Sequence, residues 1–157
     1  MNPLRIEQVA GAEKLRALSA LEAACFPDDA WSEEALDAFL AASIRKGFLL
    51  LEGEQAIGYI ILTVFDGEAE IERLGIAPEQ RGAHKGRRML NMVLELLAAE
   101  RCLLEVNARN LAAVKLYEAC GFETFSKRTA YYHDGADALM MEWKRKNECI
   151  EKCDPGH

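Results

Sequence analysis

Basic side chains gather in one short loop of an otherwise acidic chain, residues 81–88, which contains three arginines, one lysine and no acidic residue. Gly82 and Gly86 lie among them, and glycine allows a backbone to approach a ligand closely. The loop joins a strand pattern to a helical pattern, so backbone N–H groups and the positive end of a helix dipole would meet there. The pattern predicts a pyrophosphate site; a solvated basic loop is the alternative.

Two titratable residues further along could move protons. Glu105 lies near the end of an apolar strand pattern, and Tyr117 lies in the helical pattern that follows. A carboxylate can accept a proton from a reacting group, and a phenol can donate one. Each residue also has a purely structural interpretation, since a strand Glu usually faces solvent and a helical Tyr usually packs its ring.

The elements that must position these residues follow from the spacing of apolar side chains and from turn residues. Ser32 and Asn110 are predicted to cap helices, and Gly121 to end one. The predicted strands are 4–9, 48–52, 56–65, 68–76, 102–106, 122–132 and 138–143, and the predicted helices are 11–24, one that follows Ser32, 86–100 and 110–120. This order indicates an α/β (α+β) domain with antiparallel strands first and one β-α-β crossover later.

The strand predicted at 68–76 contains a slip in its apolar phase. Ala69 and Ile71 alternate with acidic residues, and then Leu74 and Ile76 become the apolar positions. A one-residue slip turns side chains to the opposite face unless a bulge absorbs it. We predict a β-bulge near residues 72–73, which would leave backbone N–H groups available to a ligand. A strand that simply ends at Arg73 explains the pattern equally well.

The same region carries a family resemblance. Residues 70–78 (Glu-Ile-Glu-Arg-Leu-Gly-Ile-Ala-Pro) and 81–86 (Arg-Gly-Ala-His-Lys-Gly) resemble the acetyl-CoA motif of the GNAT acetyltransferases, whose loop reads Gln/Arg-x-x-Gly-x-Gly/Ala. Arg81 and Gly86 match its first and last positions, whereas His84 replaces the middle glycine. The imidazole either crowds the pyrophosphate or points outward and adds a donor.

The resemblance implies a GNAT-like fold, with a mostly antiparallel central sheet flanked by helices and a bulged strand near 72–76. It also implies acetyl-CoA as co-substrate and no metal. The cofactor contacts that we expect come from Leu74, Gly75, Ile76, Arg81, Gly82, Ala83, His84, Lys85, Gly86, Arg87 and Asn110.

Further motifs are similar to those of one subgroup, the bacterial ribosomal-protein-alanine N-acetyltransferases. They are Leu-Glu-Val-Asn-Ala-Arg-Asn at 104–110, Leu-Tyr-Glu-Ala-Cys-Gly-Phe at 116–122, Cys-Phe-Pro-Asp at 25–28, Trp-Ser-Glu-Glu at 31–34, and Arg128 with residues 131–138. This likeness implies that Glu105 is the proton acceptor and Tyr117 the proton donor. It implies acetyl transfer to the N-terminal α-amine of a protein, with the N-terminal alanine of a small-subunit ribosomal protein as target.

These roles suit the chemistry of such a transfer. A terminal α-amine has a pKa of about 8, so a base must remove its proton before it attacks a thioester. Glu105 could do so directly or through one water, Tyr117 could protonate the departing thiolate, and N–H groups at the bulge could stabilise the carbonyl oxygen. We expect direct attack in a ternary complex. Two alternatives are a small-metabolite amine acetyltransferase of the same fold and a non-catalytic CoA-binding regulatory module.

Length and charge limit the possible partners. The 157 residues fit one domain, predicted at 1–144, with a polar, mobile tail at 145–157. With 19 Lys and Arg against 26 Asp and Glu, the net charge of −7 argues against direct nucleic-acid binding and suits a basic polypeptide. No apolar run approaches the ~20 residues that span a membrane, and the start lacks a signal-peptide pattern. We expect a cytoplasmic protein; the sequence does not determine its oligomeric state, for which we favour a monomer over an oligomer.

The five cysteines are odd in number, and three of them, Cys25, Cys102 and Cys120, lie inside apolar patterns. This favours free thiols in a reducing compartment. Cys149, Cys153 and His157 lie four residues apart and would share one helix face, as metal ligands can. An ordinary polar chain end is the alternative that we favour.

Overall fold

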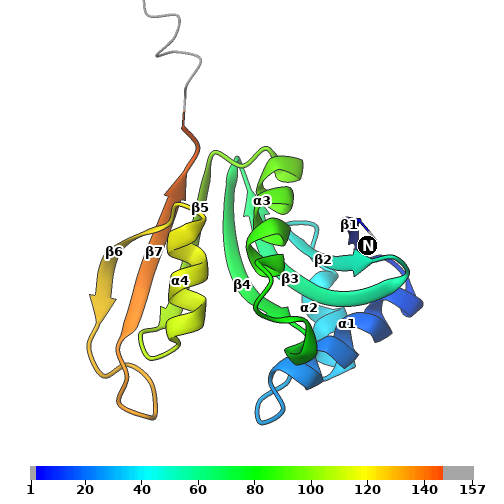
Figure 1. Cartoon of the computed structure of the whole chain (residues 1–157), viewed down its shortest axis with the longest axis horizontal. Helices are drawn as coiled ribbons and strands as arrows, with labels where there is room; N and C mark the ends of the chain where they lie inside the picture. The colour runs from blue at the N-terminus through cyan, green and yellow to red at the C-terminus, as the bar shows by residue number, and fades with distance from the viewer. Residues whose placement is uncertain (1–2, 147–157) are drawn as a thin grey trace, which may run out of the picture.

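The computed structural model describes residues 3–146, which form a seven-stranded sheet in the order β1-β2-β3-β4-β5-β7-β6 (Figure 1). Every neighbouring pair is antiparallel except β4 and β5, which are parallel. The elements are β1 (Leu4–Gln8), α1 (Ala12–Cys25), α2 (Glu33–Leu40), β2 (Arg45–Glu52), β3 (Gln55–Phe65), β4 (Glu68–Ile76), a 3₁₀ turn (Pro78–Gln80), α3 (Lys85–Leu97), β5 (Arg101–Asn107), α4 (Leu111–Ala119), β6 (Glu123–Arg128) and β7 (Ala138–Lys144). The predicted fold class and element order are confirmed.

Helices cover both faces of the central strands, so those strands are apolar on both sides. Successive residues of β2 illustrate this, because Leu50 packs with α3 in one core cluster and Leu49 packs with α1 and α2 in the other. Similarly, Ile60 and Tyr59 of β3 point to opposite clusters. This explains why the sequence of β2 and β3 reads as continuous apolar runs rather than as an alternation. No helix within residues 3–146 is long and apolar enough to cross a membrane.

The predicted bulge lies in β4. Ile61 of β3 pairs with Arg73 and Leu62 pairs with Ile71, so Glu72 is the extra residue. Before the bulge, Ile71 packs in the cluster under α3; after it, Leu74 and Ile76 do. The extra residue thus restores the apolar phase, and the alternative of a strand that ends at Arg73 is wrong.

The two halves of the sheet separate next to this bulge. The parallel pairing of β4 with β5 runs only from Glu68↔Arg101 to Ile71↔Leu104. Beyond it the strands diverge, as Figure 1 shows at the lower centre, and residues 72–76 turn their β5-facing edge toward the space between them. Strands that diverge in this way leave backbone N–H and C=O groups without ladder partners.

Three element boundaries differ from the prediction by more than one residue. Strand β2 begins at Arg45 rather than at 48, and α3 ends at Leu97 rather than at 100 because Ala98 adopts a left-handed conformation with a φ of 50°. Strand β6 ends at Arg128 rather than at 132. The residues that follow form a loop, in which the Asp137 carboxylate accepts from the Ala130 N–H at 2.9 Å.

Candidate active site

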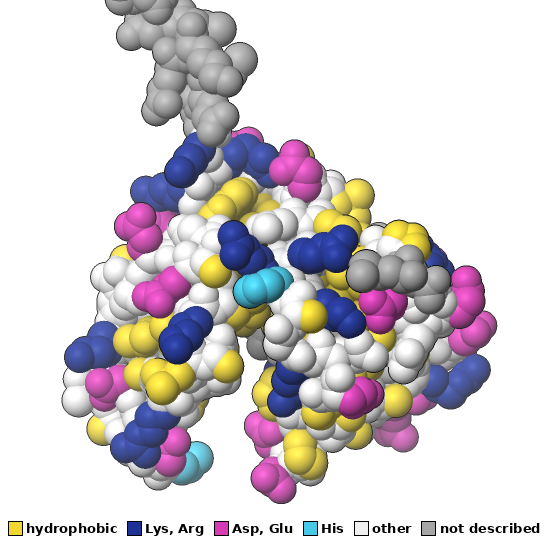
Figure 2. Space-filling view, viewed as in Figure 1, with side chains coloured by type: hydrophobic (Ala, Val, Ile, Leu, Met, Phe, Trp, Pro, Cys, Tyr) yellow, Lys and Arg dark blue, Asp and Glu magenta, His cyan; other side chains and the backbone are white. Residues whose placement is uncertain are grey.

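A cleft of about 1020 Å³ opens where β4 and β5 diverge. Its walls come from β4, the loop before α3, the end of β5 and one side of α4. The space-filling view shows a hollow between the two halves of the molecule, with Lys and Arg side chains near its upper end (Figure 2). The cleft therefore joins the basic loop and the proton-transfer candidates that the sequence singled out.

The predicted phosphate loop lies at one end of this cleft. It passes through Gly82, with a φ of 90°, and His84, with a φ of 56°, before α3 begins at Lys85. His84 occupies the N-cap position without a side-chain capping bond, so its side chain satisfies none of the first-turn N–H groups. A helix N-terminus of this kind can bind an anion through its backbone N–H groups.

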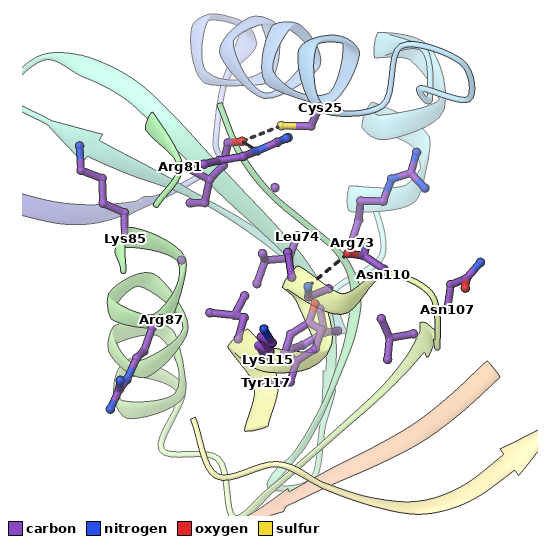
Figure 3. A pocket seen from close by; sticks show the side chains of 18 of the residues that line it. Cys25, Arg73, Leu74, Arg81, Lys85, Arg87, Asn107, Asn110, Lys115 and Tyr117 are labelled. Carbon is purple, nitrogen blue, oxygen red and sulfur yellow. Dashed lines mark hydrogen bonds between the residues drawn. The ribbon is translucent and has the colours of Figure 1, made fainter. Parts of the chain in front are cut away.

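The basic side chains of the loop differ in their surroundings. Figure 3 shows Arg81 alongside Cys25, and its Nε donates to the Ile76 carbonyl at 2.9 Å. Lys85 Nζ contacts Glu52 at 3.3 Å and the Gln80 side chain at 2.6 Å. These two cations thus brace the loop against β4 and β2.

The bulged strand approaches α1 so closely that only glycine fits at position 75. A Cβ there would lie 2.8 Å from Cys25 Sγ and 2.8 Å from Tyr59 Cε1. The Cys25 thiol also contacts the Ile76 carbonyl at 3.4 Å. The backbone at 74–76 is therefore held tightly along the cleft, where an extended ligand could bond to it as an added strand would.

Glu105 lies on β5 at the cleft wall, with its side chain 30% exposed. The Tyr132 hydroxyl donates to its Oε2 at 3.4 Å, and Arg128 lies 4.0 Å from its Oε1. Burial raises the pKa of Tyr132, and the charge of Glu105 adds to that shift. The carboxylate is thus oriented by two side chains from the end of β6 and the loop after it, and it remains open to the cleft.

Tyr117 lines the cleft from α4 and is only 7% exposed. Its ring packs against Phe122 with centroids 5.6 Å apart. Burial raises the pKa of Tyr117, with smaller contributions from Cys102 and Cys120. The hydroxyl therefore stays protonated across the neutral range and can act as a donor.

Two further carboxylates, those of Glu70 and Glu72 in β4, line the cleft near Glu105. Burial raises the pKa of Glu70, and the nearby charges of Glu72 and Glu105 raise it further. Glu72 is fixed by the Thr63 hydroxyl, which donates to its Oε2 at 2.7 Å. This end of the cleft is therefore acidic and suits a cationic group, whereas the loop at the other end suits an anion.

The sequence-predicted residues converge well. All of them line the cleft except Ala83, which is exposed. Asn110 also caps α4, since its side chain accepts from the Ala113 N–H at 3.2 Å. No site role was predicted for Glu70, Arg73 or Tyr132, although all three lie in segments that carry the family resemblance, Glu70 and Arg73 in residues 70–78 and Tyr132 in residues 131–138.

Three of the five cysteines lie within the described residues, and the predicted metal candidates do not. Cys25, Cys102 and Cys120 are free, and burial raises the pKa of each thiol. No group of His, Cys, Asp or Glu within residues 3–146 could hold a metal ion. Cys149, Cys153 and His157 lie outside the described residues.

Known proteins similar to this chain agree on one family. The model of the Acetyltransferase (GNAT) family matches residues 15–122. N-alpha-acetyltransferase RimI of Mycobacterium tuberculosis is 32% identical over 127 residues, which cover 77% of this chain and 80% of that protein. A putative ribosomal protein bS18-alanine N-acetyltransferase of Bacillus subtilis is 31% identical over 133 residues, 82% of this chain and 87% of that protein. An uncharacterized Mycobacterium leprae protein is 32% identical over 119 residues, and the chain spans 33% of its length.

Solved structures agree with this result. The ribosomal-protein-S18-alanine N-acetyltransferase from Escherichia coli matches with a TM-score of 0.79 and 26% identity, over 90% of this chain and 94% of that chain. Spermidine N-acetyltransferase from Vibrio cholerae, in complex with CoA and spermine, matches with a TM-score of 0.74 and 21% identity, over 90% of this chain and 95% of that chain. The second likeness concerns the fold alone.

Proposed function

The chain belongs to the GNAT acetyltransferase family, and from this premise we propose that it moves acetyl from acetyl-CoA to the N-terminal α-amine of a protein. It is an acetyl-CoA-dependent N-acetyltransferase, which removes the non-catalytic module from the alternatives. The finer proposal is that the acceptor is the N-terminal alanine of a small-subunit ribosomal protein. Relatives from Bacillus subtilis and Escherichia coli named for that activity support it.

One observation carries the proposal: a single cleft is lined both by the basic loop before α3 and by the carboxylates of Glu70, Glu72 and Glu105. Acetyl-CoA supplies the activated acetyl group when bound. We assign its pyrophosphate to the backbone of residues 81–86 and its extended arm to the β4 edge at 74–76. Asn110, Lys85 and Arg87 line the same path and complete the proposed cofactor site.

The proposed chemistry needs one base and one acid at the place in the cleft where the acetyl group of the cofactor meets the acceptor amine. Glu105 accepts a proton from the acceptor amine, directly or through one water, and the neutral amine then attacks the thioester carbonyl. Tyr117 donates its proton to the departing thiolate sulfur. The β4 backbone N–H groups beside the bulge stabilise negative charge on the carbonyl oxygen as it develops.

The acceptor side favours a peptide that carries positive charge. Glu70, Glu72 and Glu105 face the cleft together, and the whole chain has a net charge of −7. Ribosomal proteins are basic, so their N-termini would be attracted to this end of the cleft.

Two variants test the catalytic assignment. Glu105→Gln and Tyr117→Phe keep the size of each side chain and remove its proton transfer, so acetyl transfer to an N-terminal Ala peptide should fall about 10²–10⁴-fold. CoA affinity, measured by calorimetry, should stay close to that of the wild type. Transfer rates that are unchanged in both variants would overturn the assignment.

A second candidate function is transfer to a small amine. The acidic end of the cleft would also attract a polyamine, and the Vibrio cholerae structural neighbour is named as a spermidine N-acetyltransferase. Parallel assays with spermidine and with an N-terminal Ala peptide separate the two candidates. Activity confined to spermidine would reject the protein substrate.

A further inference from the structure

Glu22 of α1 has a fully buried side chain, with an exposed fraction of 0%. Among residues 3–146 it is the one charged residue that is buried. The Arg73 guanidinium donates to its carboxylate at 2.7 and 3.1 Å, the Trp31 N–H donates at 2.9 Å, and the Tyr59 hydroxyl also donates to it. Burial alone would raise the pKa of Glu22, but these bonds lower it below its usual value of 4.5. Glu22 is therefore a buried carboxylate that is charged at neutral pH.

The bulge in β4 directs Arg73 toward this carboxylate. Alternation in a regular strand would place Arg73 on the face of Ile71, under α3. The extra residue, Glu72, reverses the phase, and Gly75, two residues after Arg73, faces Cys25 at the end of α1. The bulge thus exposes the cofactor edge of β4 and also orients the arginine that pairs with α1.

Arg73 also contacts the segment between α1 and α2, residues 26–32, which we call the α1–α2 loop. Its Nη2 donates to the Asp29 carbonyl at 3.0 Å and lies 3.6 Å from the Asp29 carboxylate. Its guanidinium lies 3.9 Å from the centre of the Phe26 ring. The Trp31 N–H bond to Glu22 holds the far end of the loop. Arg73 and the buried Glu22 therefore fix both ends of one loop.

This arrangement is better suited to fixing a geometry than to adding stability. A buried ion pair is often no more stable than apolar residues of the same volume, because both charges lose their hydration. The planar fork of arginine, in contrast, gives directional bonds to two partners at once. Here those partners are the Glu22 carboxylate and the Asp29 carbonyl.

The α1–α2 loop lies at the acidic end of the cleft. Phe26 and Arg73 line the cleft, as do Glu72 and Glu105. In Figure 3, Arg73 lies on the opposite side of the view from Lys85 and Arg87. An acceptor that enters opposite the phosphate loop would therefore pass this wall.

We propose that Glu22 and Arg73 are positioning residues that hold the α1–α2 loop as the acceptor-side wall of the cleft. This proposal rests on the proposed transfer to a peptide amine. It adds that the Glu22–Arg73 pair determines the affinity for the acceptor. The pair touches no reacting atom, so its loss acts on acceptor binding and leaves the chemical step and the cofactor end unchanged.

The test uses the double variant E22Q/R73M in the full chain. The amide oxygen that replaces one Glu22 carboxylate oxygen can still accept from the Trp31 N–H, and the amide NH2 can donate to the Tyr59 hydroxyl oxygen. No charge is left buried, and the contact with Asp29 is lost. We expect KM for an N-terminal Ala peptide to rise about tenfold with kcat nearly constant, the signature of lost binding rather than lost catalysis. CoA affinity should stay constant, and amide hydrogen exchange should become faster in residues 26–32.

The matched control is R101M/E142L, which removes an ion pair between β5 and β7 outside the cleft. It should change neither KM nor exchange in the loop. If E22Q/R73M does not fold, Arg73→Lys keeps the charge and loses the fork, and it should raise the peptide KM by a smaller factor. Wild-type peptide KM and loop exchange in a folded variant, or an equal loss of CoA affinity, would overturn the proposal.

The same experiment separates this proposal from the proposed function. If the wild type acetylates spermidine and no peptide, transfer to a protein is rejected. KM for spermidine then replaces the peptide KM, and exchange in the α1–α2 loop still reports on positioning without any acceptor.

Discussion

Replacement of Gly75 by alanine tests the close approach of β4 to α1 at the cleft. The added Cβ would lie 2.8 Å from both Cys25 Sγ and Tyr59 Cε1, and 3.1 Å from Cys25 Cβ. Non-bonded carbon atoms prefer about 3.5–4.0 Å, so the neighbours or the strand must move. Neither neighbour moves easily, because Tyr59 is fully buried and bonded to Glu22, and Cys25 ends α1.

The size of the effect follows from this geometry. Overpacking of a tight interior costs about 1–3 kcal/mol. For a domain of this length each kcal/mol lowers Tm by about 2–4 °C, so Gly75→Ala should lower Tm by about 2–12 °C. A displaced β4 edge should also weaken acetyl-CoA binding, because residues 74–76 lie along the proposed cofactor path.

Thermal unfolding followed by circular dichroism measures the first effect, and calorimetric titration with CoA measures the second. Gly47→Ala is the control, since its Cβ would meet Leu40 and Val9 at 3.4 Å, an ordinary contact, and its Tm should change little. Cys25→Ala in the Gly75→Ala background removes one clashing atom and should restore part of the stability. A Gly75→Ala protein with wild-type Tm and CoA affinity would refute the reasoning.

Two other changes have defined outcomes. His84 has a φ of 56°, a conformation that costs an L-residue about 1 kcal/mol, so His84→Gly should raise the stability of the fold. If the imidazole crowds the loop, the same change should also tighten CoA binding. A clear loss of CoA affinity in calorimetry would instead indicate that His84 contacts phosphate. The lowered pKa of Glu22 contributes stability above the unfolded value of 4.5, and this contribution disappears as pH falls through the folded pKa. Wild-type stability in urea should therefore drop below about pH 4.5 more steeply than that of Glu22→Gln, and parallel pH curves would contradict this.

Local patterns were enough to predict the framework. The phase slip between Ile71 and Leu74 predicted the bulge, and Ser32 and Asn110 cap α2 and α4 as their residue types suggested. These features depend on residues close together in the chain, where alternation and capping bonds are readable from sequence.

Features that depend on distant or unusual contacts were not predictable. Helical spacing puts Glu22 on the apolar face of α1 with Leu18 and Leu21, but its partner Arg73 is 51 residues away and no local pattern identifies it. Helix α3 ends at Leu97 because the next residue, Ala98, is in a left-handed conformation; a glycine at that position would have indicated the helix end in the sequence. The Asp134 and Asp137 side chains bond to backbone N–H groups in the loop after β6, and such local bonds compete with strand pairing.

The central claim is transfer of acetyl to an N-terminal α-amine, and mass spectrometry across a panel of peptides tests it most directly. The panel should include an N-terminal Ala peptide from a small-subunit ribosomal protein, the same peptide with a blocked α-amine, and spermidine as a separate acceptor. The account predicts one acetyl group on the α-amine of the Ala peptide and none on the blocked peptide. Acetyl found only on spermidine or on lysine side chains would contradict it.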